Sequence, residues 1–134
     1  GKTSFREEVK ELTNGNGADV IYDPVGGDVF DESIRCINWG GRLLVIGFAG
    51  GRISNLPVNY PLIKGFSVIG VRAGEYGRKN PDLGKENIDI INNLANEGKL
   101  KPHICKIFSF EHSLEALKYL KDRKLIGKVV ISIS

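Results

Sequence analysis

The 134-residue chain has 41% hydrophobic and 26% charged residues and a formal net charge of +3, which is typical of a folded globular domain and excludes disordered and fibrous chains. Its length suffices for one domain with its own core. No apolar run reaches the ~18 residues of a membrane span, and the opening residues GKTSFREEVK are not a signal peptide, so we expect a cytoplasmic protein with no membrane partner.

A helix and a strand are predicted at the start of the chain. Ser4 and Glu7 have the spacing of a capping box, which predicts a helix that begins after Ser4 and ends in the Asn- and Gly-rich residues 14–17. The run ADVIYD predicts a strand over residues 18–23. Asp28 is then expected to cap a second helix that stops before Gly40.

Two further strands are predicted over residues 42–47 (RLLVIG) and 67–71 (SVIGV). Both are continuously apolar, as are inner strands of a parallel sheet that are buried on both faces. A polar loop is expected over residues 74–85, helices over residues 86–97 and after Ser109, and a last strand in GKVVISIS. Strands that alternate with helices predict an α/β fold with a doubly wound parallel sheet.

Three predicted strands end in small or glycine-rich turns: DPVGG, GFAGG and GVRAG. Glycine is abundant, with 17 residues where an average usage of ~7% predicts about nine. In an open α/β sheet, ligands bind beyond the carboxyl ends of the strands. The turns therefore indicate either a place where the backbone approaches a ligand or tight connections alone.

Side chains suited to acid–base, nucleophilic or metal chemistry are sparse. His103 and His112 have no ligand-type neighbours at metal-binding spacing, and Cys36 and Cys105 lack C-x-x-C spacing and are expected to be buried free thiols. Asp23 precedes a proline at a strand end, which favours a turn residue over a general base. We therefore assign no catalytic residue and no metal site.

The lysine-rich C-terminal third does not indicate a nucleic-acid partner. Its basic residues are interleaved with acidic and apolar ones, and no aromatic ladder accompanies them. This pattern is typical of a solvated helix face.

Four segments, in their order and spacing, resemble the zinc-independent quinone oxidoreductases of the medium-chain dehydrogenase/reductase superfamily: GADVIYDPVGGDVFDESIRCINWGGRLLVIGFAGG, PLIKGFSVIGV, GKLKPHI and LIGKVVIS. The resemblance implies the second half of a Rossmann-type doubly wound parallel sheet plus a C-terminal helix–strand segment. Residues 1–104 would be a partial nucleotide-binding domain, and residues 105–134 a closing segment that returns to the family's catalytic domain. The glycine-rich diphosphate turn G-x-G-x-x-G, which this chain lacks, would lie upstream.

The resemblance also implies a nicotinamide cofactor, NADPH with NADH as the alternative, on three turns. The implied contacts are Val25, Gly26 and Gly27 after the first strand, Gly47, Phe48, Ala49 and Gly50 after the second, and Val71, Arg72 and Ala73 after the third. Lys128 is implied to reach toward the cofactor phosphates.

The implied activity, in the full-length protein, is hydride transfer from NADPH to the activated double bond of a quinone or enone without a metal. We expect the chain alone to be inactive and to form a homodimer through the edge of the strand over residues 67–71. One alternative is a dimerising Rossmann fragment with no activity of its own. A methyltransferase-type Rossmann domain is a weaker alternative, because DPVGG lacks the second proline and the aromatic residue of its D-P-P-aromatic turn.

Overall fold

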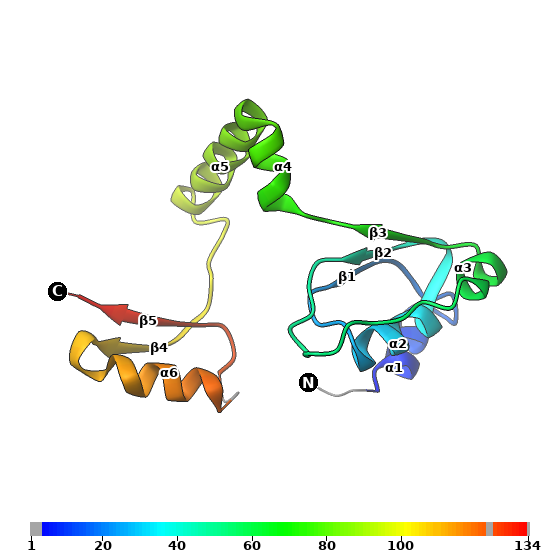
Figure 1. Cartoon of the computed structure of the whole chain (residues 1–134), viewed down its shortest axis with the longest axis horizontal. Helices are drawn as coiled ribbons and strands as arrows, with labels where there is room; N and C mark the ends of the chain where they lie inside the picture. The colour runs from blue at the N-terminus through cyan, green and yellow to red at the C-terminus, as the bar shows by residue number, and fades with distance from the viewer. Residues whose placement is uncertain (1–3, 123–124, 134) are drawn as a thin grey trace. The chain divides into compact units, whose positions relative to one another are not determined.

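The computed structural model describes residues 4–122 and 125–133 and has two compact units, one within residues 1–76 and the other within residues 77–134 (Figure 1). The division expected at residue 104 concerns the domains of the family and stays a prediction. Each unit contains one parallel sheet, three-stranded in the first and two-stranded in the second. The α/β class with parallel sheets is therefore confirmed.

The sheet of the first unit has the order β1 (Ala18–Asp23), β2 (Ile37–Val45) and β3 (Ser67–Gly70). The three strands are parallel, and Asp23, Val45 and Gly70 are paired at their carboxyl ends. An irregularity lies at the opposite end, where the register between β1 and β2 shifts between Ala18 and Val20. The carboxyl edge of this sheet is therefore the regular one.

Three helices accompany this sheet: α1 (Arg6–Leu12), α2 (Asp28–Cys36) and α3 (Asn59–Lys64). Helices α1 and α2 lie on the same side of it (Figure 1). Apolar residues of α2, β2 and the segment before β3 form the core, which consists of Phe30, Ile34, Ile37, Leu43 and Phe66. Burial of one apolar helix face against the sheet thus determines where α2 lies.

The expected side-chain caps of the helices are wrong. Helix α1 begins after Phe5 without a side-chain cap, and Glu7 accepts a hydrogen bond from Arg6 instead of reaching back toward Ser4. Gly27, and not Asp28, precedes α2, because the carboxylate of Asp28 binds an arginine from a distant loop. A capping side chain can be bound instead by a partner of opposite charge, which is the adjacent Arg6 at α1 and the distant arginine at α2.

The expected burial of residues 67–71 on both faces is wrong for β3, in which Ser67, Val68, Ile69 and Gly70 are all exposed. β3 is an edge strand of the sheet among the described residues. A run of apolar residues indicates that a strand has a surface suited to burial. It does not indicate which partner buries that surface.

The polar loop expected over residues 74–85 is wrong, because α4 (Ala73–Lys79) and α5 (Pro81–Asn96) occupy this stretch. Pro81 is the first residue of α5, a position where its missing N–H costs no helical hydrogen bond. Gly77 and Gly84 bring the two helices together, since a Cβ atom on Gly84 would lie 2.8 Å from the Cα atom of Gly77. These glycines permit a helix crossing and do not form a turn.

The second unit also holds β4 (Ile104–Ser109), the 3-10 turn η1 (Phe110–His112), α6 (Ser113–Lys121) and β5 (Lys128–Ser132). β4, which the sequence analysis does not predict, pairs in parallel with the predicted last strand β5, and Ser134 lies outside the described residues. Helix α6 packs on this pair through the buried Ala116. The ring centroids of Tyr119 in α6 and Phe108 in β4 are 6.1 Å apart.

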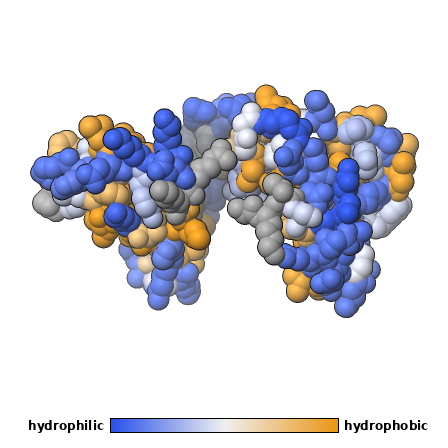
Figure 2. Space-filling view, turned by 90° about the horizontal axis from the view of Figure 1, so that it is seen from below, coloured by the Kyte–Doolittle hydropathy of each residue, from blue (hydrophilic) through white to orange (hydrophobic). Residues whose placement is uncertain are grey.

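Both units expose apolar side chains among hydrophilic ones (Figure 2). Those more than four-fifths exposed are Leu12, Val58, Leu62, Ile126 and Ile133. Across the part of the chain that the structure describes, no helix combines the length and the apolarity that crossing a membrane requires.

Leu43 is the central core residue of the first unit, with an exposed fraction of 0%. We expect Leu43→Ala to lower the free energy of unfolding by about 2–5 kcal/mol, because it removes buried methyl groups and leaves a cavity. Leu62→Ala, at a leucine 82% exposed, is the control and should change that free energy by less than about 0.5 kcal/mol. Equal losses in denaturant titrations of the two variants would contradict the packing described.

Candidate functional site

Three turns leave the carboxyl edge of the first sheet and contain ten of the eleven residues implied to bind the cofactor. They are residues 25–27 after β1, 47–50 after β2 and 71–73 after β3. Because the three strands are parallel and end in register, these turns lie side by side. We call them together the turn platform.

Asp23, the last residue of β1, shapes the first turn. It is 1% exposed, and its Oδ1 atom accepts hydrogen bonds from the amides of Val25 and Gly26, both at 2.9 Å. A carboxyl oxygen in this position replaces a backbone acceptor and closes the turn locally. The interpretation of Asp23 as a turn residue is confirmed.

The first two turns are hydrogen-bonded to each other beyond the ends of their strands. The amide of Ala49 donates to the carbonyl of Pro24 at 3.1 Å, and that of Gly50 donates to the carbonyl of Val25 at 2.8 Å. The turns therefore continue the sheet as one surface.

Glycine permits this close approach between the turns. Gly26 has a φ of +68°, and a Cβ atom there would lie 2.9 Å from Cδ1 of Phe48. A Cβ atom on Gly50 would lie 3.0 Å from the carbonyl oxygen of Val25. The space that these glycines leave is thus filled by the neighbouring turn, which places the ring of Phe48, 44% exposed, over Gly26.

The third turn is joined to the second strand through the backbone. The amide of Val71 donates to the carbonyl of Val45 at 3.0 Å, and Ala73 begins α4. Arg72 is exposed and lies 3.6 Å from the carboxylate of Glu75. This turn therefore presents a half-buried valine, a cation and a small residue at the same edge as the other two.

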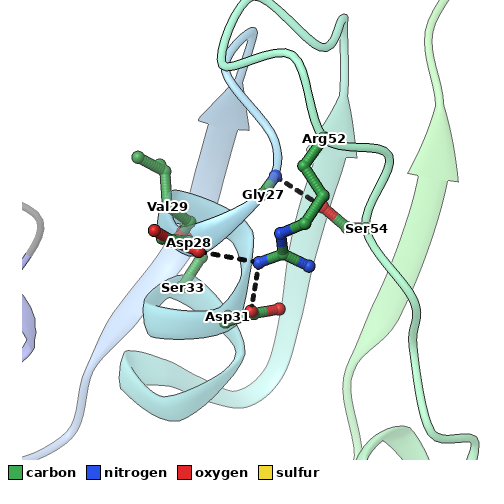
Figure 3. Close-up of polar contacts among 7 residues, drawn as sticks. All are labelled: Gly27, Asp28, Val29, Asp31, Ser33, Arg52 and Ser54. Atoms are coloured by element: carbon green, nitrogen blue, oxygen red, sulfur yellow. Dashed lines mark hydrogen bonds and ion pairs between the residues drawn. The ribbon is translucent and has the colours of Figure 1, made fainter.

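Two residues that the sequence analysis does not single out, Arg52 and Ser54, hold the loop after β2 against α2 (Figure 3). The guanidinium of Arg52 donates to Asp28 at 2.9 Å and to Asp31 at 2.5 Å, and the hydroxyl of Ser54 accepts from the amide of Gly27 at 2.8 Å. Their partners are 21 to 27 residues away along the chain. No local spacing marks such contacts in the sequence.

Lys128, the eleventh implied residue, lies in the second unit. It is exposed at the start of β5, and its amide donates to the carbonyl of His103 at 2.8 Å. Its implied role toward the cofactor phosphates stays a prediction.

The histidines and cysteines form no reacting set with one another. His112 Nδ1 lies 2.8 Å from the hydroxyl of Ser109 in an exposed turn. Both cysteines are free, and Cys36 is buried as expected, whereas Cys105 is only half-buried. Burial raises the pKa of the Cys36 thiol, which disfavours the thiolate.

A concavity of about 200 Å³ lies at the amino edge of the sheet and is lined by Lys10, Arg35 and Lys64 together with Cys36. Each of these cations belongs to the last turn of a helix: α1, α2 and α3. Lys64 donates to the carbonyl of Ile34 at 2.8 Å, and burial lowers its pKa. Cations at helix C-termini complement the helix dipoles, which accounts for this cluster without a ligand.

Comparisons with known proteins identify a family. The profile described as zinc-binding dehydrogenase matches residues 2–131. The quinone oxidoreductase-like protein 2 homolog of Nematostella vectensis is 39% identical over 98% of this chain and 36% of its own length. The acryloyl-coenzyme A reductase of Sulfurisphaera tokodaii is 31% identical over 96% of this chain and 35% of its own length.

A solved structure supports the same family assignment. The crystal structure of an NAD-dependent alcohol dehydrogenase has a TM-score of 0.79 and 28% identity over 98% of this chain and 36% of that chain. The chain thus spans little more than a third of the length of the proteins it matches.

The described residues do not fit a zinc site, since no group of three or more His, Cys, Asp or Glu side chains comes together among them. The turn platform does fit a nicotinamide, because it offers a half-exposed phenyl ring beside small residues over which a flat ring can lie closely.

We expect Asp23→Ala to lower the free energy of unfolding by about 2–4 kcal/mol, because the amides of Val25 and Gly26 would lose their acceptor in a largely buried place. Asp23→Asn retains a carbonyl oxygen there and should lose clearly less. Denaturant titrations measure both. Equal losses for the two variants would contradict a role of Asp23 as acceptor for the turn.

Proposed function

Since this chain belongs to the zinc-binding dehydrogenase family of the medium-chain dehydrogenase/reductase superfamily, we propose that it is the nicotinamide-binding portion of an NADPH-dependent quinone or enone oxidoreductase. The observation that carries this proposal is the turn platform, in which three implied cofactor-binding turns meet at the carboxyl edge of a parallel sheet. Ligands of open α/β sheets bind at this edge.

Each turn has a distinct role in the proposal. Val25 and the ring of Phe48 would support the nicotinamide ring, and the exposed Ala49 and Gly50 would let the ribose lie close to the backbone. The peptide groups of residues 71–73 would bond the carboxamide. When bound, the nicotinamide supplies the hydride, and the contribution of this chain is to orient the ring and exclude water from one face.

The substrate class rests on the relatives. These relatives are a quinone oxidoreductase-like protein and an acryloyl-coenzyme A reductase. Quinones and acryloyl thioesters share a carbon–carbon double bond activated by a carbonyl group. We therefore propose hydride transfer to such a double bond. We propose NADPH as the donor, with NADH as the alternative because one structurally similar alcohol dehydrogenase is NAD-dependent.

The first experiment is a titration of this chain with NADPH and, separately, NADH, followed by nicotinamide fluorescence and calorimetry. Trp39 is a poor reporter, because it lies near the start of β2 against Gly65, at the end of the strand opposite to the turn platform. We expect Ala49→Leu to weaken binding at least about tenfold, because its side chain would occupy the exposed surface of the platform.

Ala95→Leu is the matched control, since Ala95 is an exposed alanine of α5. It should leave the affinity unchanged. Equal effects of the two variants, or no binding of either cofactor by the chain, would contradict a nicotinamide site on this platform. Oxidation of NADPH by quinones and acryloyl thioesters is then assayed in the full-length protein, and a protein that binds the cofactor and reduces neither class would contradict the proposed substrates.

A second candidate function is a dimerisation module. β3 is exposed along its whole length and forms an edge of the sheet among the described residues. Edge strands with unpaired backbone groups pair readily with another chain. This candidate fits a homodimer related by two-fold symmetry. The family match gives no support to a methyltransferase.

We expect the chain to sediment as a dimer at micromolar concentrations and Val68→Lys, in the middle of β3, to shift it toward the monomer by placing like charges beside the two-fold axis. Val58→Lys, at an exposed valine outside the strands, is the control for the added charge. A concentration-independent monomer, or an equal shift in both variants, would contradict dimerisation through this edge.

A further inference from the structure

The loop over residues 47–54 contains the second turn and the four residues after it, and two of those four residues make side-chain contacts of their own. After Gly50, the chain has no helix or strand until α3, and Ile53 is 70% exposed. Backbone hydrogen bonds tie the start of this loop to the first turn, through Ala49 and Gly50. A few residues further on, its attachment depends on the side chains of Arg52 and Ser54 (Figure 3).

Arg52 lies across the junction between the first turn and α2. A Cβ atom on Gly27 would lie 3.5 Å from Cβ and 3.7 Å from Nε of Arg52, so the arginine stem covers this glycine. The guanidinium then meets Asp28 and Asp31, which are three residues apart and therefore on one face of α2. The hydrogen bonds from Arg52 to Asp31 and Asp28 raise the arginine pKa, so its charge is constant in the neutral range.

Ser54 adds a second attachment of the same loop. Its hydroxyl accepts the amide of Gly27, the residue that precedes α2 and has a φ of +57°. Gly27 is thus held by Ser54 through its backbone and covered by Arg52. Each exposed ion pair contributes little alone, but several contacts that converge on one short loop restrict it together.

We propose that Arg52, with Ser54, is a positioning residue that clamps the loop over residues 47–54 onto Gly27 and the first turn of α2, and so sets the surface that receives the nicotinamide. The loop places Phe48 and Ala49, two of the residues proposed to contact the cofactor, just before the clamp. The effect on cofactor binding rests on the proposed function, whereas the effect on the loop itself does not.

The test measures amide hydrogen exchange by NMR in this chain, with and without NADPH. In Arg52→Gln, we expect exchange of the amides of Gly27, Ala49 and Gly50 to accelerate about three- to tenfold, and NADPH to bind more weakly by a similar factor. Exchange of the amides of Leu43 and Leu44 in β2 should stay unchanged. Ser54→Ala should accelerate hydrogen exchange of the Gly27 amide in particular, because this amide loses its acceptor.

Two further variants separate positioning from a general effect of charge. Arg52→Lys keeps the charge but meets the two carboxylates less well, so its exchange rates should fall between those of the native chain and Arg52→Gln. Arg42→Gln removes an exposed arginine of β2 and should change neither the three amides nor the affinity.

Unchanged exchange at the three amides in Arg52→Gln would overturn the proposal. Equal acceleration throughout the strands would also overturn it, because Arg52 would then stabilise the unit as a whole. Faster local exchange with an unchanged affinity for NADPH would overturn the positioning role. If the native chain binds no nicotinamide cofactor, the proposed function fails, while the exchange rates alone still support or overturn the clamp.

Discussion

The buried carboxyl group of Asp23 is the constraint on which the rest of the site depends. It lies at the last position of β1 and accepts two amides of the turn that follows, so the backbone reverses there without leaving buried donors unpaired. The backbone carbonyl of Asp23 also accepts a hydrogen bond from the amide of Ile46, which aligns β2 with β1 up to the point where both strands end. The positions of Val25, Gly26 and Phe48 follow from this alignment.

The glycines show which parts of the structure the sequence predicts correctly and which parts it predicts wrongly. At residues 26 and 27 the glycines lie at the end of an apolar run, and their positive φ angles agree with the predicted turn. At residues 77 and 84 the same residue type lies inside two helices that cross closely, where a loop is expected from composition. A missing side chain permits a turn or a close contact, and only the partner decides which of them forms.

Local patterns predict the alternation of strands and helices, the turn role of Asp23 and the edge at which the turns gather. They do not predict the caps of α1 and α2, the exposure of β3 or the roles of Arg52 and Ser54. The start of α2 and the roles of Arg52 and Ser54 depend on residues far away in the sequence, and the exposure of β3 depends on a surface without a partner among the described residues. At α1, the adjacent Arg6 binds the carboxylate of Glu7. β4 is also not predicted from the sequence. The burial of this strand alternates only weakly, and Phe108 is its one buried residue.

The hydrogen bonds between the first two turns have a thermodynamic consequence for any ligand that lies on them. Because Ala49 and Gly50 already donate to Pro24 and Val25, the backbone there is ordered before a ligand arrives. Little conformational entropy is then lost on association, and weak contacts to a flat ring can still produce measurable affinity. A surface of this kind selects ligands by shape complementarity, and its association rate is set by diffusion and orientation instead of by loop closure.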